Sequence, residues 1–226
     1  RIQVIVLAHN QVSCMSQKTR NSSRATANIT SYNRAAEESY ELTNAPILDQ
    51  RFRNLPQEIQ DEFNRLSEIA PINSAEAIPR LLELKQQYPL PLIYSCLAIA
   101  YGRVDPKKQK QMIAENYAKN PKNLFARCNY ARLCLAENNP DEIPNIFANQ
   151  FELKPLYPKR NQFHITEYTG LTSVMCEYHI QKKQTEQAEA LFEKLQEVAP
   201  EAADTLQIKA LLQPSIFERI RRKLFA

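Results

Sequence analysis

Glycine is almost absent from this sequence: Gly102 and Gly170 are the only two among 226 residues. Average usage of about 7% would give about sixteen. β-Hairpin turns, phosphate-binding loops and tight catalytic turns need the backbone freedom of glycine, so the sequence argues against all three. The 14 prolines separate long glycine-free segments, which is typical of helix boundaries. The composition therefore predicts an all-helical protein.

Signals for membrane insertion, metal binding and catalysis are also missing. No run of about 18 apolar residues is present, which argues against a transmembrane helix. The five cysteines have no regular spacing, so we expect reduced thiols rather than a disulfide framework. No Cys-x-x-Cys or His-x-x-x-His spacing indicates zinc, and no Gly-x-Ser-x-Gly motif indicates a nucleophile. We therefore expect no enzyme, no metal and no cofactor.

Basic residues are concentrated at the two ends of the chain. Residues 1–36 contain five basic residues and no acid, and residues 214–226 contain four basic residues and one acid. Since the whole chain carries +4 and these ends carry +5 and +3, the residues between them carry −4. The interpretation that we favour is solvated ends of an ordinary protein; contact with an anionic partner or surface is the alternative.

The N-terminal third has two parts. Residues 1–31 are expected to form a flexible polar leader, because most of them are polar and lack periodicity. Residues 1–8 are apolar and could be a signal remnant, a strand or a helix start. A first helix is expected at 32–42, within an N-terminal helix and linker at 32–55. The reduced thiols suggest a cytoplasmic protein, with export into a host cell or a removed signal sequence as alternatives.

Prolines recur at a nearly regular interval in the rest of the chain. Pro89, Pro121, Pro155 and Pro200 each follow a helix-like segment, at spacings of 32, 34 and 45 residues. This pattern resembles the tetratricopeptide repeat, whose period is 34 residues and whose second helix ends at such a proline. The longest spacing equals 34 residues plus an 11-residue insertion, for which "LYPKRNQFHIT" at 156–166 is the candidate.

Internal positions support the resemblance, which covers residues 56–212 and about four repeats. Ala77 and Ala188 match the small position of a second helix, although Gln109 and Ile143 depart from it. The resemblance implies an all-α, right-handed superhelix, or solenoid, of antiparallel helix pairs. Helices are expected at 56–69, 75–88, 91–102, 106–119, 123–137, 140–152, 163–181, 185–198 and 201–212.

A last helix is expected at residues 214–226. Ile216, Phe217, Ile220 and Leu224 fall on one face of it, and its basic residues fall largely on others. The favoured interpretation is a C-terminal capping helix, because solenoids need a polar outer face at their ends. The alternative is an assembly or membrane-surface module that acts through this helix. The basic residues concerned are Arg219, Arg221, Arg222 and Lys223.

The resemblance also implies a function and a site. In that family the first helices line a concave groove that binds a peptide or a partner protein. Asn129 and Arg132 are the expected polar anchors, and Cys128 is expected beside them on the groove wall, with Cys134 and Cys176 in the core. Transferring the repeat phase gives these groove residues: Asn64, Ser95, Ile99, Arg103, Phe125, Cys128, Asn129, Arg132, Ser173 and Glu177.

Two other kinds of ligand are disfavoured by the sequence. The segment from Leu156 to Tyr168 mixes aromatic and basic residues, but an anchored loop explains it better than nucleic-acid binding. The chaperone-binding clamp known in the family needs Lys or Asn in the helix "LIYSCLAIAY", which has neither. We therefore predict a non-enzymatic adaptor or scaffold whose partner is a protein or peptide of unknown identity.

Overall fold

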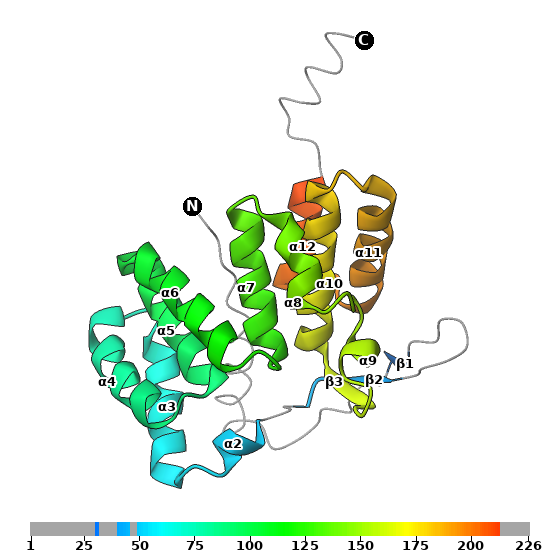
Figure 1. Cartoon of the computed structure of the whole chain (residues 1–226). Coiled ribbons are helices and arrows are strands. Elements are labelled where there is room, and N and C mark those ends of the chain that lie inside the picture. Colours follow the sequence, from blue (N-terminus) through cyan, green and yellow to red (C-terminus); the bar gives the residue numbers. More distant parts are fainter. Residues whose placement is uncertain (1–29, 32–39, 46–48, 213–226) are drawn as a thin grey trace.

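A computed structural model describes residues 30–31, 40–45 and 49–212 (Figure 1). This part of the chain is mostly helical, which confirms the predicted all-α class in its coarse form. Most of the polar leader lies outside the described residues, as does the basic helix predicted at 214–226, with Arg219, Arg221, Arg222 and Lys223.

The first half of the described chain follows the predicted helices to within about two residues. Asn73, Asp105 and Asn123 accept hydrogen bonds from backbone N–H groups in the first turns of the helices that they precede. Pro91 and Pro106 occupy first-turn positions, where no N–H is required. The predicted helices appear as α3 (Gln57–Ile69), α4 (Ser74–Gln87), α5 (Pro91–Val104), α6 (Pro106–Lys119) and α7 (Leu124–Ala136). The short helix α2 (Gln50–Arg53) was not predicted and lies in the expected linker.

The prediction of a single helix at 140–152 is wrong. The chain forms a 3₁₀ turn, η2 (Pro140–Glu142), and a single helical turn, α8 (Ile143–Ile146). Ala148 and Asn149 then adopt left-handed backbone angles, with φ of 51° and 57°. The N–H of Asn149 donates to the Pro144 carbonyl at 2.8 Å, a bond typical of a helix C-terminus. The short helix α9 (Leu153–Leu156) follows.

A small sheet replaces the end of the helix predicted at 32–42. Strand β2 (Glu41–Thr43) pairs antiparallel with β1 (Thr30–Ser31) and parallel with β3 (Gln162–His164), which belongs to the predicted insertion. Leu42 is opposite Phe163 in this register, and both side chains are buried. The strand forms because its hydrogen-bonding partner is supplied from far along the chain, which a local pattern does not reveal.

The later helices also confirm most of the predicted boundaries. They are α10 (Ile165–Gln181), α11 (Thr185–Val198) and α12 (Ala203–Leu212). Each long helix packs against its neighbour in the chain (Figure 1). Helix α7 packs directly against α10, although α8, α9 and β3 separate the two in the sequence. Because one helix cannot bury its own apolar face, each pair depends on the next for its core.

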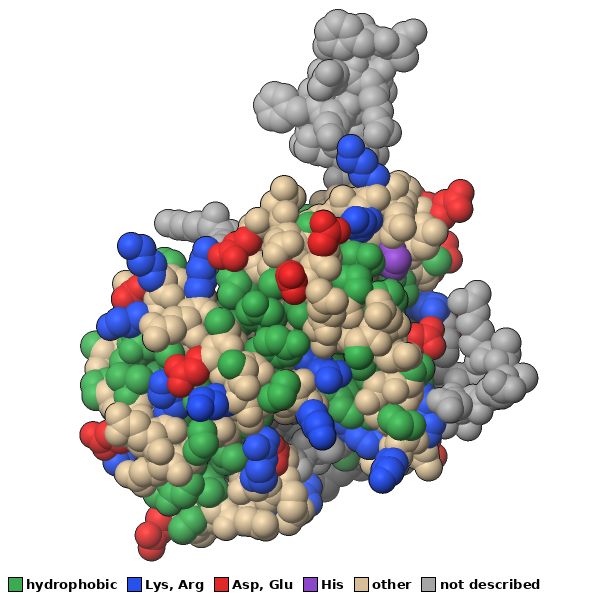
Figure 2. All heavy atoms as spheres, in the orientation of Figure 1, with side chains coloured by type: hydrophobic (Ala, Val, Ile, Leu, Met, Phe, Trp, Pro, Cys, Tyr) green, Lys and Arg blue, Asp and Glu red, His purple; other side chains and the backbone are tan. Residues whose placement is uncertain are grey.

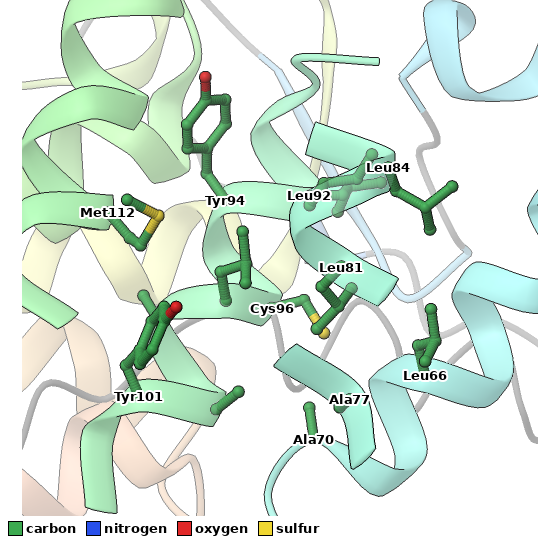
Figure 3. Packing of buried hydrophobic residues seen from close by; sticks show 14 of the residues in the cluster. Leu66, Ala70, Ala77, Leu81, Leu84, Leu92, Tyr94, Cys96, Tyr101 and Met112 are labelled. Atoms are coloured by element: carbon green, nitrogen blue, oxygen red, sulfur yellow. The ribbon is translucent and has the colours of Figure 1, made fainter. Parts of the chain in front are cut away.

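The core consists of three clusters along this stack. The first joins α2 to α6, and Figure 3 shows Leu81 of α4 and Cys96 of α5 packed together in it. The second joins α7 to α10 and contains Phe147 and Phe163. The third lies between α10, α11 and α12 and has only four buried members: Cys176, Ala188, Leu195 and Ile208. The C-terminal end therefore has the smallest buried apolar core in the described part of the chain.

The structure explains why Gln109 can replace the small residue expected in α6. Gly102 of α5 faces it, and a Cβ added to Gly102 would lie 2.8 Å from Gln109 Nε2. Real Cβ atoms do not approach a neighbour this closely. Gly102 thus leaves room for the end of the flexible Gln109 side chain, which an added Cβ would displace.

Replacing Gly102 with alanine tests this fit. The displaced atom is the end of a flexible side chain, so overpacking should cost near the lower end of roughly 1–3 kcal/mol. The gain in helix propensity of about 1 kcal/mol offsets this cost, and we expect Gly102→Ala to leave the stability nearly unchanged. The double variant Gly102→Ala/Gln109→Ala should be more stable than Gly102→Ala, because the obstructing amide is gone. Urea unfolding of the two single variants and the double variant measures the coupling, and strictly additive effects would contradict the explanation.

Candidate functional site

The predicted groove residues lie on α3, α5, α7 and α10, but most of them are buried. Arg103 is exposed, whereas Asn64, Ile99 and Glu177 are half-buried. The prediction that the other six residues line an open groove is therefore wrong. The buried residues are Ser95 on α5, Ser173 on α10, and Phe125, Cys128, Asn129 and Arg132 on α7.

On α5, the predicted face is divided between the core and the surface. Ser95 faces α6, where the Asn116 amide lies 3.5 Å from its hydroxyl. Its position in the helix pair explains why it does not line a groove. Ile99 and Arg103, one turn apart further along α5, stay accessible on the same side. These two are the predicted groove residues of α5 that a partner can reach.

The cysteines of α7 also differ from the prediction. Cys128 was expected on the binding wall, but its side chain is fully buried between α7 and α10, and burial raises the pKa of its thiol to about 12. The prediction for Cys128 is thus wrong. Cys134 and Cys176 are buried, which confirms their predicted core positions, and burial raises the pKa of both thiols.

Arg132 is part of a buried ion pair that joins three helices. Its Nη2 atom lies 2.6 Å from Asp204 Oδ1 of α12 and 2.7 Å from Ser173 Oγ of α10. The other Asp204 oxygen accepts a hydrogen bond from Thr169 Oγ1 at 3.0 Å. Arg132 and Asp204 are each 4% exposed. Arg132, predicted as a polar anchor for a ligand, therefore binds a carboxylate of its own chain.

Glu177 extends this cluster toward the surface. Its carboxylate is 3.9 Å from Arg132 Nε and accepts a hydrogen bond from Gln207 Nε2 of α12 at 3.0 Å. Burial raises the pKa of Glu177; the negative charge of Asp204 also raises it, whereas Arg132 lowers it. Two carboxylates thus compete for one guanidinium, and Asp204 has the shorter contact.

Sequence reasoning found Arg132, Ser173 and Glu177 but missed Asp204 and Thr169. Asp204 is the only acid within α12, which otherwise consists mainly of alanine, leucine and isoleucine. A lone carboxylate in an apolar helix is a usable signal, because a buried charge requires a partner. The partner itself was not predictable, since it lies on α7, 72 residues earlier in the chain.

Two amide oxygens on the predicted groove side have no hydrogen-bond donor. They are Asn64 Oδ1 on α3 and Asn129 Oδ1 on α7, and both atoms are enclosed. An enclosed acceptor without a donor costs about 1–3 kcal/mol. The Asn116 amide on α6 differs, because its oxygen accepts a hydrogen bond from Asn120 Nδ2 at 3.1 Å and its nitrogen donates to the Pro91 carbonyl. The two first helices therefore keep polar groups that the fold itself does not use.

In residues 30–31, 40–45 and 49–212, no three His, Cys, Asp or Glu side chains gather closely enough to hold a metal ion. Within the same residues, no helix has the length and apolar character needed to cross a bilayer. The chain has no significant match among family models, curated proteins or solved structures.

The insertion before α10 is anchored by two polar contacts. Arg160 binds both carboxylate oxygens of Glu167, at 2.9 and 2.8 Å, and the N–H of His164 donates to the same carboxylate at 2.9 Å. His164 caps α10, because its Nδ1 atom accepts a hydrogen bond from the Thr166 N–H. Burial lowers the pKa of His164, and the Asn44 backbone and Glu167 partly oppose this shift.

Replacing Asp204 tests the buried ion pair. Asp204→Ala leaves the Arg132 guanidinium buried with less compensation, so we expect a loss of about 3–5 kcal/mol in the free energy of unfolding. The control is Asp141→Ala, which removes an ion pair of similar length to Lys182, but on a side chain that is 81% exposed. The control should cost less than about 1 kcal/mol. Equal losses in urea unfolding would refute the importance of burial.

The capping role of His164 predicts a pH-dependent stability. Because its pKa is lower in the folded chain, the unfolded chain binds more protons below the ordinary pKa of about 6.5. The contribution of His164 is therefore complete above that pH and is lost as the pH falls toward the folded-state pKa. His164→Asn keeps a capping side chain without a titrating ring. As the pH falls from 7.5 to 5, wild type should lose free energy of unfolding relative to this variant. A stability difference that does not change with pH would disprove the assignment.

Proposed function

We propose that this protein is a non-enzymatic adaptor or scaffold of the tetratricopeptide type, which binds a protein or peptide along the first helices of its repeats. The repeat interpretation is supported by the proline spacing in the sequence and by the succession of packed helix pairs, α3–α4, α5–α6 and α10–α11. The pair that would contain α7 departs from the pattern, because its second helix is reduced to α8.

The observation that carries the proposal is the pair of unused amide oxygens on α3 and α7. Backbone N–H groups of an extended peptide are the donors that such oxygens accept most readily. Asn64 and Asn129 belong to the first helices on either side of α5, and α5 presents Ile99 and Arg103 on the predicted groove side. A peptide that crosses this side would therefore find two acceptors, one apolar contact and one positive charge.

The burial of both oxygens has a consequence for binding. A partner reaches them only if the packing around them opens locally, so we expect binding to include a conformational adjustment. Ile99 and Arg103 are accessible without any change and would make the first contacts. Arg132 has no direct role in this proposal, because its guanidinium already binds Asp204.

Replacing the two asparagines with leucine separates function from stability. Leucine has a similar size and removes the unused acceptor, so Asn64→Leu/Asn129→Leu should have an unchanged or higher melting temperature than wild type. The same variant should lose the partners that wild type retains in affinity capture followed by mass spectrometry. Reduced capture with preserved stability supports the proposed groove, and full capture by the variant would remove it.

Asn116→Leu is the matched control for this experiment. Its amide donates to the Pro91 carbonyl and contacts Ser95 and Asn120, so the same substitution should lower the melting temperature. At a temperature where the control is folded, it should still capture the partners. If the control lost them to the same extent, the effect would reflect general destabilisation instead of groove contacts.

A further inference from the structure

Two stretches of the chain combine several basic residues with no acid. Between Glu115 and Glu137 there are four basic residues, and between Glu152 and Glu167 there are three. Arg132 of the first stretch is buried against Asp204. The other six lie at the surface or are half-buried: Lys119, Lys122, Arg127, Lys154, Lys159 and Arg160. We call these six side chains the basic corner.

The tertiary structure brings the two stretches together through Tyr157. Its hydroxyl donates to the Lys122 carbonyl at 2.9 Å, which ties the insertion to the connection between α6 and α7. Arg127 and Arg160 both lie close enough to act on the titration of this hydroxyl, although burial raises the pKa of Tyr157 to about 12. Figure 2 shows basic side chains gathered on the face that includes this region. The corner therefore exists only in the folded chain.

Most of the positive charge in the basic corner is uncompensated. Arg160 is paired with Glu167, but Arg127 donates to the Pro121 carbonyl, and Lys154 donates to two carbonyls and an amide oxygen. Within the described chain, no carboxylate forms an ion pair with any of the other five. By contrast, Lys85, Lys110 and Lys182 elsewhere on the surface are each ion-paired. Exposed Glu41 and Glu152 lie at the edges of the corner.

The surroundings limit the kinds of anion that fit. The large apolar side chains that are exposed in the described chain are Ile72, Val104, Leu206 and Leu211, and none belongs to the corner, so groups for membrane insertion are lacking. The ring of Phe163 is buried under Arg160, whose Cζ atom is 4.3 Å from the ring centroid, so this ring cannot stack on a base. Outside the corner, the described residues include more acids than bases.

We propose that the basic corner binds a short acidic segment of another protein, a run of consecutive glutamates or aspartates. A membrane or a long duplex presents negative charge over a wide area and would meet the acidic remainder of the surface. An acidic peptide can match the corner alone, because charges further away than about 8 Å are screened at physiological salt. This surface is separate from the amide groove on α3 and α7 and does not depend on it.

The test uses the full chain and a fluorescent decaglutamate peptide, with binding followed by anisotropy at about 50 mM salt, where screening is weak. The variant Lys119→Glu/Lys122→Glu/Lys159→Glu reverses three exposed charges that have no ion-pair partner in the described chain. It should bind the peptide at least about tenfold more weakly than wild type. Its circular dichroism spectrum and melting temperature should match those of wild type.

The matched control is Lys107→Glu/Lys194→Glu/Lys209→Glu, which changes the net charge equally but lies outside the corner. The control should keep most of the affinity. Equal loss in both triple variants would overturn the proposal, because binding would then follow net charge alone.

Tighter, corner-dependent binding of vesicles with about 30% phosphatidylserine, or of a duplex RNA of about 20 base pairs, would overturn the choice of partner. The Asn64→Leu/Asn129→Leu variant should bind the peptide as wild type does, which separates this test from that of the groove.

Discussion

The ion pair between Arg132 and Asp204 connects the central helix α7 to the last described helix, α12. The apolar cluster between α10, α11 and α12 has only four buried members, so polar contacts contribute more to the position of α12 than they do elsewhere. Ser173 and Thr169 on α10 complete the arrangement by contacting Arg132 and Asp204 respectively. A buried charge that has found its partner fixes the relative positions of the helices, because any other arrangement leaves the charge unpaired.

This ion pair changes how the predicted groove is understood. The guanidinium of Arg132 has the chemistry to hold a ligand's carboxylate, but Asp204 takes that place. Two kinds of group remain for a partner: the two asparagine oxygens without donors, and the accessible side chains of Ile99 and Arg103. The proposed function therefore rests on polar atoms that the fold leaves unused, whereas Arg132 and Asp204 serve the fold.

The insertion between Pro155 and α10 contributes more than a longer loop. Its strand β3 pairs with β2, its Arg160 binds Glu167, and Tyr157 ties it to the α6–α7 connection. The Tyr157 contact brings the stretch that contains Lys154, Lys159 and Arg160 to the connection between α6 and α7, which contains Lys122. The proposed second binding surface is thus built from the part of the chain that departs from the repeat pattern.

The sequence alone was sufficient for the mostly helical class and for most helix boundaries. Prolines at first turns, Asn and Asp caps and the scarcity of glycine are local signals, and each acts within a few residues of the boundary that it marks. The tertiary structure decided which of the predicted groove residues remain accessible. It also decided that residues 41–43 form a strand, that Gly102 makes room for Gln109, and that Arg132 is buried. Each of these outcomes depends on a partner from another helix or strand, and no local pattern contains that partner.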